Sequence, residues 1–487
     1  MKQLSLPGRT LSEYARRFRA TIRYKPQPFG HTAFGTLLIS LIGLPGSFQP
    51  ASRPIPLNHR PGSDKPNIVI LYMDDMGYAD PSCFGNRAMT TPNIDRLAKE
   101  GMRFTQYYSN SPICSPSRVA LNTGQYPQRY RVHSHFDSRA KNRERDMVDY
   151  LDPQAPTLAR ALQKAGYQTG HFGKWHMGGG RNVLDAPEPN RYGFTESFVD
   201  NFEGMGPGEH HEKLPKSHST DAYVDKAIDF IGRHKDQPFF LNLCPNDVHD
   251  PFEPKKELRQ KYARAANAYQ RDFDAVLDNL DQQIGRFMQK LTELDLDDNT
   301  LIIFTSDNGP TDWPYYYQEG VAPPGSTGPF FGRKWSLYEG GIREPFIIRW
   351  KGVIPAGRTN EKTVLAAMDL YPSLCRLAGV PVNASARLDG LDMSRALRGL
   401  SLTRQAPICW DYRRNSATLK PGNPKFVSPN LAMRHGDWKL LIYADSTNAQ
   451  LYDLKRDKGE QRNVIGQHPA VAQRMAGELL AWRKSLP

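Results

Sequence analysis

Acidic and amide side chains follow two apolar segments of the sequence, and their types suit a hard cation. Asp74 and Asp75 come directly after the run NIVILYM. Asp307 and Asn308 come directly after the run TLIIFTS. Three carboxylates and an amide oxygen, with no His or Cys among them, are ligands that calcium prefers, with magnesium second. Either pair alone could be a helix cap or a solvated turn. Two pairs at equivalent strand ends would repel each other without a cation between them, so we expect a calcium site.

Basic side chains follow other segments and predict an anion pocket beside that cation. Lys174 and His176 lie in GKWHMGGG, His249 lies in PNDVHDPF, and Lys334 lies in GRKWSLYEGG. Each alone is ordinarily a surface group. Gathered at one sheet edge together with Arg118, they would suit a tetrahedral oxyanion ester, because positive groups neutralise its oxygens and a histidine can protonate the leaving oxygen. Farther along, Arg343 and Glu344 are predicted to be structural ion-pair partners.

Cys114, in NSPICSPSRVALNTGQYP, is the candidate nucleophile. Ser115 suits the N-cap and Pro116 the first position of a helix that Arg118 continues. A thiol just before a helix N-terminus is acidified, and an anion is favoured there. The alternative is a buried cysteine beside an ordinary helix start. A thiolate next to a hard cation is a poor chemical match, which the residue types alone leave open.

Alternating strands and helices predict how these groups are brought together. In open α/β sheets the ligand lies beyond the carboxyl ends of the strands, where the polar groups above occur. After about residue 385 the pattern changes to hairpin strands and a final amphipathic helix. We therefore expect an α/β fold with a large doubly wound mixed sheet flanked by helices, followed by a smaller α+β domain. The expected strands are 67–73, 167–172, 238–244 and 300–306, the expected helices are 156–166, 221–234 and roughly 256–293, and the expected domains are 1–64, 65–384 and 385–487.

The basic charge is concentrated at the N-terminus and predicts export rather than nucleic-acid binding. The net charge is +13. Residues 1–60 hold nine Lys or Arg and one acid, around the apolar run AFGTLLISLIGL. This run fits a signal-peptide core in residues 1–64, with an uncleaved membrane anchor as the alternative, and we expect a periplasmic or extracellular protein. The five cysteines have no CxxC spacing and predict no zinc site. One or two disulfides remain possible, with Cys114 left over.

Ordered motifs over roughly residues 65–480 resemble the formylglycine-dependent sulfatases, an arylsulfatase-like family of the alkaline phosphatase superfamily. CSPSR (114–118) fits the signature C-x-P-S-R. GYQTGHFGKWHMG (166–178) fits the signature G-Y-x-T-x-x-x-G-K-W-H, with Met177 where Leu is usual. PNIVILYMDDMGYAD, TPNIDRLAKEGMRFTQYY, SDNGP and RKWSLYEGGIREPF resemble the remaining blocks. The resemblance implies an alkaline-phosphatase-like fold.

The resemblance also implies roles for the candidate residues. A maturation enzyme that generates formylglycine would oxidise Cys114, and the hydrated aldehyde would supply an oxygen nucleophile that suits calcium. One hydroxyl would attack sulfur and release the alcohol, and the other would expel sulfate. The implied calcium ligands are Asp74, Asp75, Asp307, Asn308 and an oxygen of residue 114. Arg118, Lys174 and His176 would hold and polarise the formylglycine, while His249 and Lys334 would bind the sulfate and help the alcohol leave.

Three functions follow as hypotheses. The first is a sulfatase acting on a sulfated carbohydrate, which an exported enzyme would meet. The second is a phosphonate or phosphate ester hydrolase on the same scaffold. The third is a non-catalytic binder of sulfated glycans, if Cys114 stays unmodified. Loop histidines at 133, 135, 210 and 211 could recognise substrate or be surface bystanders.

Overall fold

The central sheet is built around apolar strands that are buried along their whole length. The computed structural model describes residues 65–179, 181–199, 215–383 and 386–487. Every residue of β1 (Asn67–Met73), β5 (Phe239–Cys244) and β6 (Thr300–Ser306) is buried, as expected for strands covered on both faces. The strand order is β4-β3-β5-β1-β6-β7-β2-β8, with β9 paired to β2. The remaining strands are β2 (Met102–Tyr108), β3 (Gln168–Gly173), β4 (Glu196–Phe198), β7 (Arg343–Arg349), β8 (Arg358–Asn360) and β9 (Leu365–Ala366).

Four neighbouring strands end at the same edge of this sheet. β3, β5, β1 and β6 are parallel, with Gly173 beside Cys244 and Met73 beside Ser306. The segments that follow these strands therefore emerge together. β7 runs antiparallel to both β6 and β2, so the sheet is mixed and the predicted fold class is confirmed.

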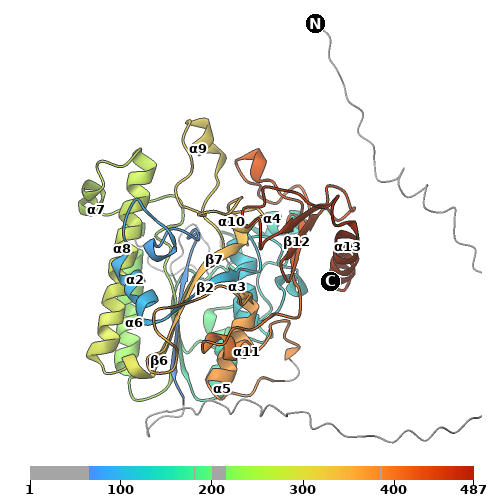
Figure 1. The fold of residues 1–487 in the computed structure, drawn as a ribbon. Helices are drawn as coiled ribbons and strands as arrows, with labels where there is room; N and C mark the ends of the chain where they lie inside the picture. Colours follow the sequence, from blue (N-terminus) through green and yellow to red (C-terminus); the bar gives the residue numbers. More distant parts are fainter. Residues whose placement is uncertain (1–64, 180, 200–214, 384–385) are drawn as a thin grey trace, which may run out of the picture. The chain divides into compact units, whose positions relative to one another are not determined.

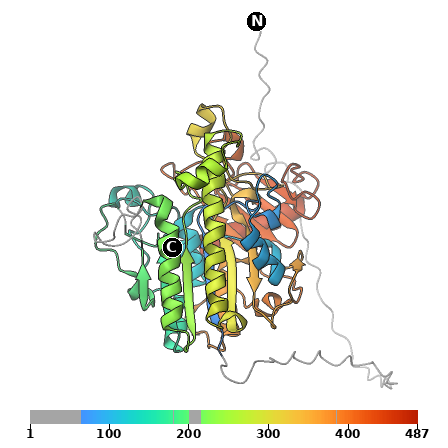
Figure 2. The same cartoon turned by 90° about the vertical axis from the view of Figure 1, so that its left-hand side faces the viewer.

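Helices cover both faces of the central sheet (Figure 1). On one face, α2 (Pro92–Glu100), α6 (Lys216–Arg233) and α8 (Ala268–Glu293) pack their apolar sides on the strands. The long helices α6 and α8 run side by side there (Figure 2). The other face is covered by α3 (Cys114–Thr123), α5 (Leu158–Lys164) and α11 (Leu370–Leu377). The shorter helices are α4 (Arg139–Glu144), α7 (Lys256–Lys261), α9 (Pro314–Gln318), α10 (Glu339–Ile342) and α12 (Ser394–Leu397).

The helix expected over roughly 256–293 is two helices, α7 and α8. Their separation is set by Asn267, whose side chain accepts a hydrogen bond from the Gln270 backbone N–H and so caps the start of α8. The amphipathic pattern is strong only in α8, since α7 buries none of its residues, so the sequence pattern did not mark the break.

The C-terminal segment forms a second, antiparallel sheet. Its order is β10 (Ile408–Asp411), β11 (Leu431–His435), β12 (Trp438–Ile442) and β13 (Gln450–Asp453). The last helix, α13 (Pro469–Lys484), packs Met475 and Leu479 against it. Trp410 Nε1 donates to the Ser109 carbonyl at 2.8 Å and ties the small sheet to the segment after β2. The predicted boundary between residues 384 and 385 stays a prediction.

The predicted export segment, residues 1–64, lies outside the described residues. Among the residues that are described, no helix is long and apolar enough to cross a membrane.

Candidate active site

The four predicted metal ligands meet at the ends of β1 and β6. Asp307 Oδ1 accepts from the Asp75 backbone N–H at 3.1 Å, and Asn308 Nδ2 donates to Asp75 Oδ1 at 2.8 Å. Asp75 has a left-handed backbone, with φ of 60°, a conformation that costs energy for a residue other than glycine. Asp74 and Asp75 are each 1 % exposed, and Asp307 and Asn308 are fully buried. The parallel register of the two strands thus gathers these side chains as the sequence predicted.

Two lysines neutralise two of these carboxylates. Lys174, which follows β3, places Nζ 2.7 and 2.6 Å from the two oxygens of Asp74. Lys334 places Nζ 2.6 and 2.5 Å from the two oxygens of Asp75. Both lysines are buried. Although burial would lower the pKa of each, the carboxylates raise it, so both lysines are cations at neutral pH.

Arg118 spans the third carboxylate and the backbone after β3. Its Nη2 lies 2.7 Å from Asp307 Oδ2 and 3.4 Å from Asp74 Oδ1. Its Nη1 donates to the Lys174 carbonyl at 3.1 Å. Arg118 is 1 % exposed, so a single guanidinium fixes the ends of three strands relative to one another.

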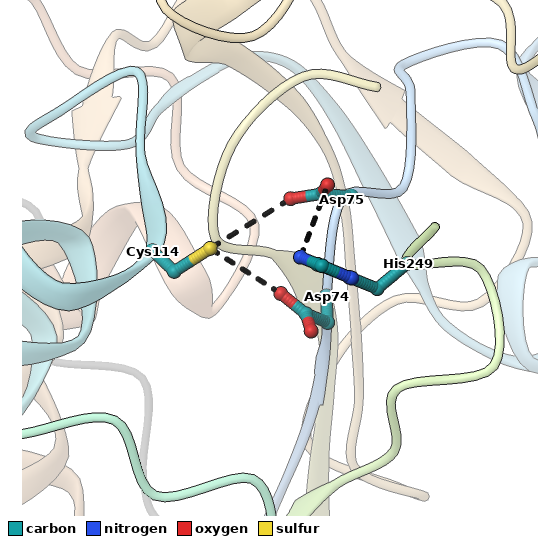
Figure 3. A group of neighbouring side chains, drawn as sticks. All are labelled: Asp74, Asp75, Cys114 and His249. Carbon is teal, nitrogen blue, oxygen red and sulfur yellow. Dashed lines mark hydrogen bonds and ion pairs between the residues drawn. The ribbon is translucent and has the colours of Figure 1, made fainter. Parts of the chain in front are cut away.

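Cys114 opens α3 and points at the carboxylates. Its Sγ lies 3.5 Å from Asp74 Oδ1 and 3.8 Å from Asp75 Oδ1 (Figure 3), and 3.4 Å from Lys174 Nζ. The helix begins two residues earlier than predicted, because Ile113 rather than Ser115 occupies the N-cap position. Ser115 is therefore not the cap. Its hydroxyl instead accepts a hydrogen bond from the Phe136 backbone N–H at 3.0 Å.

The expectation of an acidified thiol at Cys114 is wrong. Burial raises the pKa of the Cys114 thiol well above its usual value, and Asp307 and Asp74 add to this against Lys174 and Lys334. Desolvation of a thiolate among carboxylates therefore outweighs the helix dipole. As a thiol, residue 114 is protonated and a poor nucleophile.

His249 is held as a neutral imidazole of one tautomer. Its Nδ1 donates to the Asp250 carbonyl at 2.5 Å, which leaves Nε2 as an acceptor. Nε2 lies 3.4 Å from Lys334 Nζ and 3.7 Å from Asp75 Oδ2 (Figure 3). Burial lowers the pKa of His249 well below its usual value. Lys216, at the start of α6, donates to the His249 carbonyl and fixes this turn, a role the sequence did not signal.

His176 lies on the same pocket but has one nitrogen to spare. Its Nε2 contacts the Phe136 carbonyl at 3.4 Å, while Nδ1 is buried without a hydrogen-bond partner among the described residues. Burial, reinforced by Lys174, lowers the pKa of His176 well below its usual value. Because Nε2 faces a carbonyl and therefore carries the proton, Nδ1 of a neutral His176 can accept one further hydrogen bond at the site.

The carboxyl groups and the amide together fit a cation. Burial alone would raise the pKa of Asp74, but Lys174 and other cations hold it well below the usual value. Burial raises the pKa of Asp75 despite Lys334, and raises that of Asp307 to about 6 despite Arg118. Asn308 Oδ1 is buried without a hydrogen-bond partner in the described part of the chain, so it offers a free acceptor. Hard oxygen donors with a spare amide oxygen match calcium.

A second set of atoms at this site is also close enough to hold a metal. Asp74, Asp75, Cys114 and His249 offer ligand atoms that all lie within 4.8 Å of one another. The nitrogen of His249 and the sulfur of Cys114 are softer donors than the oxygens of Asp307 and Asn308. His249 was predicted to bind sulfate. Its position 3.7 Å from Asp75 would also allow it to act as a metal ligand.

A pocket of about 200 Å³ opens in front of Cys114. Its lining includes more residues than the sequence predicted. Cys114, His176, His249 and Lys334 line it, as expected, whereas Arg118 and Lys174, which were also expected at the anion pocket, are not among its lining residues. Its other walls were not predicted as site residues, apart from His135 as an open alternative. Aromatic residues next to motif positions, such as Trp335 beside Lys334, were the available signal. These walls are Ile113, His135, Phe136, Asp137, Arg181, Trp313, Trp335 and Leu419.

Of the loop histidines, His135 lines the pocket and His133 is packed in the interior. His135 lines the pocket and lies 3.7 Å from Asp137, while burial lowers its pKa to about 4. His133 is 1 % exposed, and burial lowers its pKa to about 3, which indicates a packed neutral side chain. His210 and His211 lie outside the described residues.

Two further expectations change. Arg343 pairs with Glu339 at 3.0 Å rather than with Glu344, because α10 brings Glu339 back over the start of β7. Glu344 is fully buried, and neither of its oxygens has a hydrogen-bond partner among the described residues. All five cysteines lie in the described part of the chain and are free, so the structure contains none of the possible disulfides.

Family models match nearly all of the described chain. The model described as Sulfatase matches residues 66–380. The model described as N-sulphoglucosamine sulphohydrolase, C-terminal, matches residues 327–485.

Individual proteins and structures agree. The chain is 31% identical to the N-acetylgalactosamine-6-O-sulfatase of Bacteroides thetaiotaomicron, over 86% of this chain and 93% of that protein. It is 30% identical to arylsulfatase A of Homo sapiens, over 82% and 83%. The structure of Ps i-CgsB in complex with k-i-k-neocarrahexaose superposes with a TM-score of 0.71 at 28% identity and covers 86% of this chain and 92% of that one.

Proposed function

Because this chain belongs to the sulfatase family and is a sulfuric ester hydrolase, we propose that it removes sulfate from a sulfated carbohydrate. The proposed nucleophile is a formylglycine made from Cys114, and the proposed cofactor is one calcium ion. The observation that carries the proposal is the position of Cys114, enclosed by three cations and three carboxylates at the floor of a pocket.

The surroundings of residue 114 suit an oxygen nucleophile better than a thiol. Formylglycine would supply the hydrated aldehyde as nucleophile, where the thiol is held protonated. Lys174 Nζ, 3.4 Å from Sγ, stabilises negative charge at that position. Arg118 donates to Asp307 and to the Lys174 carbonyl, and so holds Lys174 and the start of α3 in fixed positions relative to each other. His176 Nδ1 is available to hydrogen-bond the same group.

Lys334 and His249 are placed to bind the sulfate and assist the leaving alcohol. Both line the pocket, and their nitrogens lie 3.4 Å apart. The Lys334 ammonium carries the proton, and His249 Nε2 is its acceptor. Lys334 Nζ can therefore donate to the departing oxygen, with His249 orienting it or relaying a proton.

Asp74, Asp75, Asp307 and Asn308 would hold the calcium ion, together with an oxygen of residue 114. When bound, the ion would neutralise these carboxylates and polarise the sulfate ester. Asn308 supports this assignment because its oxygen has no protein partner among the described residues.

The carbohydrate part of the proposal is drawn from relatives and from location. The relatives include proteins named for N-acetylgalactosamine 6-sulfate, and one similar structure is a complex with k-i-k-neocarrahexaose. The basic, apolar N-terminal segment favours export to the periplasm or outside the cell, where sulfated polysaccharides occur.

Mass spectrometry of the peptide that carries residue 114 tests the nucleophile directly. The full chain is produced with and without a formylglycine-generating enzyme, and turnover of sulfate and phosphonate esters of the same alcohol is compared. We expect aldehyde at residue 114 and sulfate ester hydrolysis only after maturation, with Cys114→Ala inactive in both. An intact thiol in an active preparation would overturn the proposed nucleophile, and faster phosphonate turnover would overturn the proposed substrate.

A further inference from the structure

A second cavity lies apart from the catalytic pocket. It has a volume of about 540 Å³. Its lining residues come from β2, the start of β7, the segments after β8, α12 and β13, and the end of β11 with the turn that follows it. No residue that lines it also lines the pocket at Cys114. In the sequence, α10 separates Lys334 of the catalytic pocket from Arg343 of this cavity. The two cavities can therefore be changed independently.

Positive charge dominates the walls of this second cavity, which we call the basic cleft. Six cations line it, whereas only Glu361 and Asp437 supply carboxylates to its lining. Glu339 and Asp369 pair with two of the arginines, but cations still outnumber carboxylates when these are included. The cations are Arg343, Lys362, Arg404, Arg434, Lys455 and Lys458.

The arginines of the basic cleft are buried and fixed before any ligand binds. Arg343 is 3 %, Arg404 7 % and Arg434 2 % exposed. Arg343 Nε donates to the Thr105 carbonyl at 2.7 Å, and Arg434 donates to the side chains of Tyr108 and Gln106. Guanidinium groups held in this way lose little conformational entropy when they bind an oxyanion.

Arg404 has a hydrogen-bond donor to spare. Its Nε donates to the Ala406 carbonyl at 3.1 Å, and its Nη1 pairs with Asp369. Its Nη2 is buried and has no hydrogen-bond partner among the described residues. A buried donor without a partner costs free energy, and an oxyanion bound against Arg404 would offer the missing acceptor.

The lysines form an exposed outer rim. Lys362, Lys455 and Lys458 are exposed, and within the described ranges none of them forms an ion pair with a carboxylate. Exposed lysines attract a polyanion at long range, and buried arginines then provide directed hydrogen bonds. This combination fits a chain with several anionic groups better than a single small anion.

We propose that the basic cleft binds a second, uncleaved portion of the sulfated polysaccharide whose sulfate ester is hydrolysed in the catalytic pocket. The proposal rests on the function proposed above. A sulfate ester keeps its negative charge across the working pH range, and its tetrahedral oxygens accept hydrogen bonds from guanidinium groups. Binding at two positions on one polymer raises the effective concentration of the chain at the catalytic pocket.

Direct binding to an inactive protein tests the proposal. Chondroitin 6-sulfate oligosaccharides of two lengths, a tetrasaccharide and a dodecasaccharide, are titrated into Cys114→Ala by isothermal calorimetry. The cleft variant adds Lys362→Glu, Lys455→Glu and Lys458→Glu. The control variant adds Lys235→Glu, Lys256→Glu and Lys484→Glu, which make the same change in net charge at other exposed lysines. Arg404→Gln, a fourth protein, tests whether the buried guanidinium of Arg404 contributes to binding of the dodecasaccharide.

We expect the cleft variant to weaken dodecasaccharide binding by about tenfold, because several exposed charge contacts each add a small increment. The tetrasaccharide and the control variant should show no such loss. The loss should shrink at high salt, and desulfated chondroitin of the same length should bind weakly to all proteins. Equal Kd values for the cleft and control variants would overturn the proposal. Equally tight binding of desulfated chondroitin would overturn its sulfate specificity.

Turnover separates this proposal from the proposed function. In matured enzyme that keeps Cys114, the cleft variant should raise KM for the long polymer and leave kcat/KM for a small aryl sulfate unchanged. Sulfated oligosaccharide that binds through the cleft without hydrolysis would count against the proposed substrate alone. Hydrolysis of the polymer with no dependence on the cleft lysines would count against the cleft alone.

Discussion

Two of the buried charge clusters in the described part of the chain are built differently. At the catalytic pocket, Lys334 pairs with Asp75, but Asn308 Oδ1 and His176 Nδ1 have no partners among the described residues. Beside α10, the Glu339 carboxylate accepts from Tyr108 at 2.6 Å, Arg343 at 3.0 Å and Lys439 at 2.9 Å. Both clusters border a cavity, the second through Arg343 in the basic cleft, but the Glu339 carboxylate itself is surrounded by donors.

The protonation of the two clusters differs accordingly. Although burial would raise the pKa of Glu339, Lys439 and Arg343 lower it to about 2, so this carboxylate is fully compensated by the protein. At Asp75 burial outweighs Lys334 and raises the pKa, and burial likewise raises that of Asp307. Glu460, which shares Lys439 with Glu339, has its pKa raised to about 7 by burial, so the contrast lies between the carboxylates of Glu339 and Asp75 rather than between whole clusters. We infer that Glu339, whose partners are complete, holds the fold, while the carboxylates beside Asn308 have room for a ligand.

The largest expected effect is on activity, and it distinguishes Lys334 of the catalytic pocket from Lys439 of the second cluster. Lys334→Met removes the group that contacts sulfate and the leaving oxygen, so kcat for sulfate ester hydrolysis should fall by about 10³-fold. The folded state should persist with calcium present, since the ion compensates Asp75. Steady-state kinetics on matured protein, with residue 114 verified by mass spectrometry, measures this. An active Lys334→Met enzyme would remove Lys334 from the chemistry.

The matched change in the second cluster, Lys439→Met, should lower stability and leave activity unchanged. Lys439→Met leaves Glu339 and Glu460 without their shared lysine, and breaking such a buried pair costs roughly 3–5 kcal/mol. Urea unfolding should report this loss, whereas kcat per folded molecule should stay close to wild type. If Lys439→Met instead lowers kcat without lowering stability, the division between the two clusters does not hold.

Calcium should sharpen the comparison by acting on one cluster only. At a calcium concentration of 100 times Kd, the free energy of unfolding should rise by about 2.7 kcal/mol. Asn308→Ala should reduce this increment at the same concentration, because it removes the free acceptor oxygen. Lys439→Met should keep the full increment. Thermal unfolding at several calcium concentrations, with magnesium for comparison, distinguishes these outcomes, and an equal response of Asn308→Ala and wild type would contradict the ligand assignment.

The predictable part of the site follows from strand ends and the fold that aligns them. Asp74 and Asp307 could be placed together because they follow apolar runs that read as central strands, and parallel strands end at one edge. The thiol of Cys114 could not be judged in the same way. Its pKa depends on burial among carboxylates from distant segments, and this outweighs the local helix dipole that the sequence displays.

Side-chain partners in loops were the least predictable part. Arg343 was expected to pair with the neighbouring Glu344, but the short α10 positions Glu339 over it instead. Phe136 and Trp313 line the pocket from segments without a motif, so only the tertiary structure reveals them. Local patterns specify elements and their order, whereas pairing between loops depends on how those elements pack.

The smallest expected effect tests the corrected start of α3. Ser115 Oγ accepts from the Phe136 backbone N–H, and Phe136 forms a wall of the catalytic pocket. Ser115→Ala should therefore cost roughly 1 kcal/mol of stability and also raise KM, because the wall loses its anchor. Ser138→Ala is the matched control, since Ser138 caps α4 through the Lys141 backbone N–H and should cost a similar amount with KM unchanged. Denaturant unfolding and KM for one sulfate ester, measured on both variants, decide between a helix cap and a pocket anchor at residue 115. Loss of stability in Ser115→Ala with wild-type KM would mean that this hydroxyl serves the fold alone, as the Glu339 cluster does.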